Sequence, residues 1–109
     1  MKNVILNHDD DLLVFSVPDE VADNLDEYCN DFRCNWLWKN PNSEKYRHIG
    51  KDDATGKEYV YVSYTSTDFI EYLNKWIFPE SQSVLIDNLG LINEKDISEK
   101  YKDCQRYHF

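Results

Sequence analysis

Residues 16–36 read SVPDEVADNLDEYCNDFRCNW, and this stretch decides how the rest of the chain is arranged. Ser16 can cap a helix and Pro18 is tolerated in a first turn, so we expect a helix to begin here. Its apolar residues recur at the spacing of one helical face: Val21, Leu25, Tyr28, Cys29, Phe32 and Trp36. The acids Asp19, Glu20, Asp23, Asp26, Glu27 and Asp31 fall on the opposite face. The pattern predicts one amphipathic helix from about residue 18 to the high thirties, ended by Asn40-Pro41.

Two β-hairpins are expected on either side of this helix. The apolar runs 3–6 and 12–17 are joined by the polar turn His8-Asp9-Asp10-Asp11, which predicts the first hairpin. Residues 58–64, rich in tyrosine and valine, form the clearest strand pattern in the chain. With a possible strand at 45–49, they predict the second hairpin.

The remaining sequence predicts a second helix and two shorter elements. Thr65-Ser66-Thr67-Asp68 is a capping signal, and the helix after it ends before Pro79. Trp36 and Trp76 lie on the apolar stripes of the two helices and are expected to pack in the core. A short strand at 83–86, a short helix at 93–101 and an aromatic C-terminal segment that packs back complete the chain. This order predicts a single α+β domain over residues 1–109. An antiparallel or mixed sheet comes from the two hairpins, with two main helices and a short C-terminal helix packed on it.

Composition agrees with a folded domain without membrane spans. Of 109 residues, 41% are hydrophobic and 15% aromatic, which is enough for one core. No apolar run is long enough to cross a bilayer, and a secretory signal is lacking, so we expect a cytoplasmic protein. The three cysteines, Cys29, Cys34 and Cys104, are an odd number and are expected to be reduced thiols. They could hold a metal only with His48 and His108, and Cys-x4-Cys lies at the edge of zinc spacing, so we expect neither metal nor cofactor.

Negative charge is concentrated near the start of the chain. Residues 1–32 hold nine acids and one base, a charge of −8, whereas residues 33–109 hold twelve acids and eleven bases, a charge of −1; the sum is the net charge of −9. Such a field repels nucleic acid and anionic lipid and attracts basic proteins. It therefore indicates a basic protein partner, without nucleic acid or membrane. The sequence gives no signal for the oligomeric state.

The acidic helix face is the leading candidate for contact with this partner. Like charges at i and i+4 weaken a helix, and a face serving solubility alone would usually include lysine. We expect Asp23, Asp26, Glu27 and Asp31 to bind the partner, with Asp9, Asp10 and Asp11 as an extension and Trp38 as an aromatic anchor. The alternatives are that the face is only solvated, or that the strand bearing Tyr59 and Tyr61 makes the contact.

None of the usual catalytic motifs is found, so the chain is not expected to be an enzyme. There is no G-x-S-x-G, no Gly-rich phosphate loop and no H-E-x-x-H. A pocket joining His48 or His108 to a cysteine or carboxylate would favour catalysis instead.

In general character the chain resembles the immunity proteins of bacterial toxin systems. Like them it is a small, acidic, aromatic-rich α+β domain with carboxylates gathered on one helix. The resemblance rests on this character and on no signature motif. It implies that the chain neutralises a basic toxin, such as a nuclease, by covering its working surface. Two alternatives remain: a phage-encoded inhibitor that mimics nucleic acid, such as an anti-CRISPR protein, and a small enzyme or ligand-binding domain.

Overall fold

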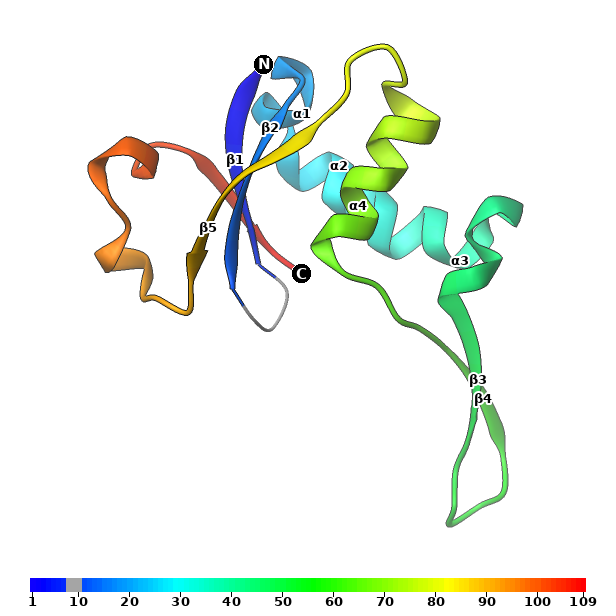
Figure 1. Ribbon diagram of the computed structural model, residues 1–109. Helices are drawn as coiled ribbons and strands as arrows, with labels where there is room; N and C mark the ends of the chain where they lie inside the picture. Colours follow the sequence, from blue (N-terminus) through cyan, green and yellow to red (C-terminus); the bar gives the residue numbers. More distant parts are fainter. Residues whose placement is uncertain (8–10) are drawn as a thin grey trace.

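The computed structural model describes residues 1–7 and 11–109, and in this part of the chain the predicted α+β class is confirmed. A four-stranded sheet, a separate two-stranded sheet and two long helices make up the fold (Figure 1). Within the described residues, no helix is both long and apolar enough to cross a membrane.

The first predicted hairpin is confirmed and forms the centre of the larger sheet. β1 (Lys2–Asn7) and β2 (Leu12–Val17) pair antiparallel, with Val4 opposite Phe15. β5 (Val84–Gly90) extends the sheet beside β2, and β6 (Gln105–His108) extends it beside β1. Because β6 runs parallel to β1, the sheet is mixed, and the aromatic C-terminus packs back as expected.

The strand β1 is buried on both faces, because the sheet is covered on both sides. Val4 and Leu6 face the core beneath the helices, together with Phe32 and Phe69. Ile5 lies between Val4 and Leu6, so its side chain points to the other face of the sheet, where it packs against Ile97 and Tyr101. The latter two belong to the segment predicted as a short C-terminal helix, which consists of two 3₁₀ turns, η4 (Glu94–Asp96) and η5 (Glu99–Tyr101).

The predicted acidic helix exists but is broken near its start. It comprises α1 (Asp19–Asp23), α2 (Leu25–Asp31), a π-helical segment η1 (Phe32–Trp36) and α3 (Leu37–Lys39). At Asn24 the backbone leaves helical geometry, with φ −129° and ψ 39°. The Asn24 side-chain amide donates to the carbonyl oxygen of Glu20 at 3.0 Å, a local bond of the kind that competes with helix continuation.

The second helix begins at the predicted cap and ends with a widened turn. Thr65 and Asp68 form a reciprocal capping box before α4 (Ser66–Tyr72), which continues as the π-helical segment η3 (Leu73–Ile77). Trp36 packs against the core as predicted, but the prediction for Trp76 is wrong, because its side chain is 47% exposed. The i→i+5 spacing of η3 moves residues after Leu73 off the 3.6-residue stripe on which the prediction rested.

The second predicted hairpin is present but does not join the main sheet. After a 3₁₀ segment, η2 (Pro41–Tyr46), strands β3 (Arg47–Lys51) and β4 (Glu58–Val62) pair only with each other. Figure 1 shows this hairpin projecting from the end of α3, away from the larger sheet. The predicted sheet made from both hairpins is therefore two sheets.

Candidate functional site: an acidic cleft between the two long helices

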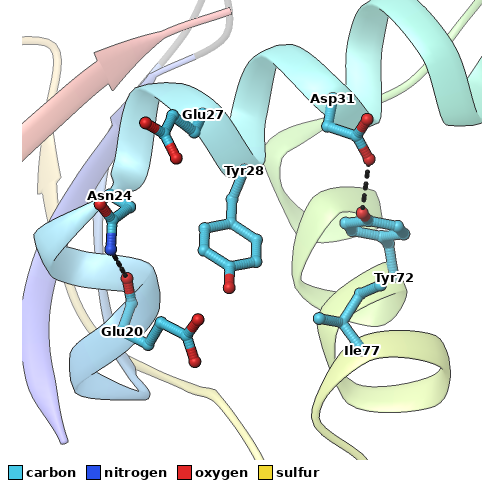
Figure 2. Close-up of a pocket in the computed structure, with 7 residues that line it drawn as sticks. All are labelled: Glu20, Asn24, Glu27, Tyr28, Asp31, Tyr72 and Ile77. Atoms are coloured by element: carbon cyan, nitrogen blue, oxygen red, sulfur yellow. Dashed lines mark hydrogen bonds between the residues drawn. The ribbon is translucent and has the colours of Figure 1, made fainter.

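The break at Asn24 creates a cleft lined by carboxylates. Because α1 and α2 follow different axes, Glu20 on α1 and Glu27 and Asp31 on α2 line one cleft of about 340 Å³. Tyr28, Tyr72 and Ile77 line it too, the last two from α4 and η3 (Figure 2). We call this the acidic cleft.

Two tyrosine hydroxyls lie among the carboxylates. The Tyr72 hydroxyl donates to a carboxylate oxygen of Asp31 at 3.2 Å, and the ring below it is buried (Figure 2). Burial raises the pKa of Tyr72, and the Asp31 charge raises it further. Burial also raises the pKa of Tyr28, and the nearby carboxylates of Glu20 and Glu27 raise it further. Both hydroxyls therefore stay protonated at neutral pH and keep a proton to donate.

The acids of the cleft are not neutralised by nearby bases in the described part of the chain. No ion pair there involves Glu20, Asp26, Glu27 or Asp31. Arg33, the one base on this helix before Lys39, donates instead to the hydroxyl of Tyr107 on β6 at 3.2 Å. The negative potential of the cleft is therefore open to solvent.

The predicted contact residues do not all lie together. Glu27 and Asp31 line the acidic cleft, and Asp26 is exposed on the same helix. Asp23 lies on α1 and forms an ion pair with Lys2 at 2.7 Å. A partner that contacts Asp23 would have to compete with this lysine.

The remaining predicted residues lie elsewhere. Asp11 accepts a hydrogen bond from Asn88 at the end of the sheet, at 3.1 Å. Asp9 and Asp10 lie outside the described residues. Trp38 is 43% exposed on α3, but it does not line the cleft.

Five residues that line the cleft were not among the predicted contacts: Glu20, Asn24, Tyr28, Tyr72 and Ile77. The helical spacing places Glu20 on the acidic face and Tyr28 on the apolar face, and both placements depend on a straight helix. Tyr72 and Ile77 come from the second helix, so no spacing within one helix could reveal them. Asn24, a residue that competes with helical hydrogen bonds, was the one available signal of the break.

A second cleft bears on the catalytic alternative. His108 and Asp96 both line a cleft of about 460 Å³ beside Asn7 and Leu91. A histidine that serves as a general base needs hydrogen-bond reach to its partners. Among the described residues, no hydrogen bond joins His108 to Asp96, and no group of three or more His, Cys, Asp or Glu is placed to hold a metal ion. The three cysteines are free thiols, with Cys29 buried and Cys34 exposed.

Comparison of the chain with protein-family models, with curated proteins and with solved structures gave no match, so the site is interpreted from its own geometry.

Proposed function

We propose that this chain is an immunity-type inhibitor that binds a basic protein, such as a toxin, through the acidic cleft. The observation that supports the proposal is the convergence of Glu20, Glu27 and Asp31 on one cleft, with no base paired to them in the described residues. Asp26 adds a fourth exposed carboxylate on the same helix.

The walls of the cleft suit a lysine or arginine side chain from the partner. Ile77 and the ring of Tyr28 offer apolar surface for the methylene stem. The charged end would then lie among carboxylates, where charge-assisted hydrogen bonds are stronger than neutral ones. A cation beside Tyr28 would also gain from the negative face of the ring.

The shape of the site favours a protein partner over the nucleic-acid-mimic alternative. A mimic of nucleic acid would need negative charge spread along an extended surface, as phosphates are along a strand. Here three of the carboxylates gather around one cleft with an apolar wall. That arrangement suits the insertion of a single basic side chain.

The direct test combines a growth assay with charge-neutralised variants. Cells expressing the protein encoded by the neighbouring gene should recover growth when this chain is co-expressed. A triple variant, Glu20→Gln, Glu27→Gln and Asp31→Asn, should lose this protection. It should also associate about tenfold more slowly at low salt, with a flatter salt dependence.

A matched control separates the cleft from overall charge. Asp53→Asn, Glu80→Gln and Asp103→Asn change the charge by the same amount at exposed positions outside the acidic cleft. This control should protect like the unchanged chain. If both triple variants behave alike, the cleft is not the contact site. If the protein encoded by the neighbouring gene is not toxic and does not bind this chain, the immunity role itself is contradicted.

A further inference from the structure

The β3–β4 hairpin exposes apolar side chains on both faces. Ile49 and Val60, which are cross-strand partners on one face, are 72% and 53% exposed. On the other face, Tyr59 is 53% exposed and its ring lies across Gly50, where a Cβ would overlap it. An isolated two-stranded hairpin is only marginally stable in water, so pairing with a further strand would stabilise this one.

The hydrogen bonds of the hairpin show which backbone groups are free to receive that strand. The amide of Asp52 donates to Lys57 and that of Ser63 to Tyr46, at 2.8 and 2.9 Å. Bonded pairs alternate along an antiparallel ladder, so Tyr59 and Tyr61 direct their backbone groups toward β3. The outward groups along the free edge of β4 are therefore those of Glu58, Val60 and Val62, and along β3 those of Arg47, Ile49 and Lys51.

We propose that the chain forms a two-fold symmetric dimer in which β4 pairs antiparallel with β4 of a second copy, centred on Val60. In this register Val60 lies opposite Val60 of the second copy, Tyr59 opposite its Tyr61, and Glu58 opposite its Val62. No like charges face each other within β4. One face of the resulting four-stranded sheet carries a row of Ile49 and Val60 from each copy, and the other carries four tyrosines.

The free edges of β3 and β5 are less suited to self-pairing. The same symmetric pairing along β3 would set Arg47 opposite Lys51 of the second copy twice, and like charges directly opposite are destabilising. Along β5, the register against β2 shifts at two places and Asp87 lies in the middle of the strand. Such irregularities and edge charges discourage pairing.

The charge distribution also favours a second copy as the occupant. Residues 47–62 contain the bases Arg47, Lys51 and Lys57 and the acids Asp52, Asp53 and Glu58, so the hairpin carries no net charge. Residues 1–32 carry −8. Pairing through the projecting hairpins lets two acidic bodies associate through their neutral parts (Figure 1).

Sedimentation analysis of the full chain over a wide range of concentration tests the dimer. The expected mass at high concentration is twice the 13.0 kDa of one chain. Val60→Asp places two carboxylates directly opposite each other and should raise the dissociation constant of the dimer by about tenfold or more. Ile49→Asp is the matched control: its two carboxylates would lie three strand spacings apart, about 14 Å, so its effect should be smaller.

Disulfide cross-linking gives a second readout, and its variants add no charge to the hairpin. In a Cys34→Ser background, which removes the exposed native thiol, Val60→Cys should form a cross-linked dimer on mild oxidation, because opposed residues on paired strands lie within disulfide reach. Ile49→Cys should not. A wild-type chain that stays monomeric at every concentration overturns the proposal, as does a dimer that survives Val60→Asp or cross-links preferentially through Ile49→Cys.

Discussion

Tyr72 joins the core to the acidic cleft through one side chain. Its ring packs 5.2 Å from that of Phe32, and its hydroxyl reaches Asp31 on the opposite helix. Tyr72→Phe keeps the ring and removes this donor. We expect the free energy of unfolding to fall by about 1 kcal/mol, because Asp31 is exposed and water can replace the lost bond.

Chemical denaturation measures this change, and Tyr61→Phe is its control. Tyr61 is exposed on the hairpin and its hydroxyl makes no hydrogen bond with another described residue. Its replacement should alter stability by less than about 0.5 kcal/mol. Equal effects at the two positions would refute a stabilising role for the Tyr72–Asp31 bond.

Tyr72 also makes the stability of the fold sensitive to alkaline pH. Burial raises the pKa of Tyr72 above its ordinary value of 10.0. Below that pH the hydroxyl is protonated in both states and its contribution is complete. Above it the unfolded chain releases a proton that the folded chain retains, so stability falls as pH rises. The stability difference between wild type and Tyr72→Phe should therefore shrink between about pH 8 and pH 11. A constant difference would contradict the raised pKa.

At the scale of elements, Ser43 fixes the end of α3 to the hairpin. Its buried hydroxyl lies 2.7 Å from the carbonyl oxygens of Trp36 and Asn40, and it accepts a bond from the Arg47 guanidinium. Arg47 also donates to the carbonyl oxygen of Leu37 at 2.9 Å. Together they satisfy carbonyl groups that a helix end leaves unpaired.

Ser43→Ala should lower the free energy of unfolding by about 1–3 kcal/mol, because it removes a buried hydroxyl that donates to the helix-end carbonyl oxygens and accepts from the charged Arg47 guanidinium. Ser63→Ala, at an exposed position in the segment between β4 and α4, should be close to neutral. Thermal unfolding of the two variants provides the comparison. A neutral result for Ser43→Ala would mean that Arg47 alone satisfies the helix end.

The elements that depend on local spacing were predictable from the sequence, and those that depend on distant partners were not. The first hairpin follows from two apolar runs, and α4 from the capping signal at Thr65. The break at Asn24 and the π-helical turns escaped prediction because a fixed helical period cannot register them. β6 was expected only as a segment that packs back, since pairing with β1 across the whole chain leaves no local pattern. Only two residues of the acidic cleft were predicted as contacts, for the same reason: Glu27 and Asp31 lie on the predicted face, whereas Tyr72 comes from another element.

At the scale of the whole molecule, the uneven distribution of charge predicts that thermal stability depends on salt concentration. Carboxylates on α1 and α2 repel one another, and added salt screens that repulsion. The melting temperature should therefore rise from low to moderate NaCl concentration. The Glu20, Glu27 and Asp31 triple variant should be more stable at low salt, by a few tenths of a kcal/mol for each relieved like-charge pair, and should respond less to salt.

The Asp53, Glu80 and Asp103 control should keep most of the wild-type salt response, because its acids are dispersed over the surface. Thermal unfolding in a series of NaCl concentrations distinguishes the two variants. Identical responses would show that net charge alone, and not its crowding on α1 and α2, sets the repulsion.

The parallel pairing of β1 with β6 has a consequence for biosynthesis. β1 is synthesised well before β6, yet residues 105–109 cover its outer edge. While the ribosome is still adding the segment between them, the nascent chain carries an open edge beside Val4, Ile5 and Leu6. Until β6 has been synthesised, this edge is open to pairing with other extended chains, and the arrival of β6 closes it.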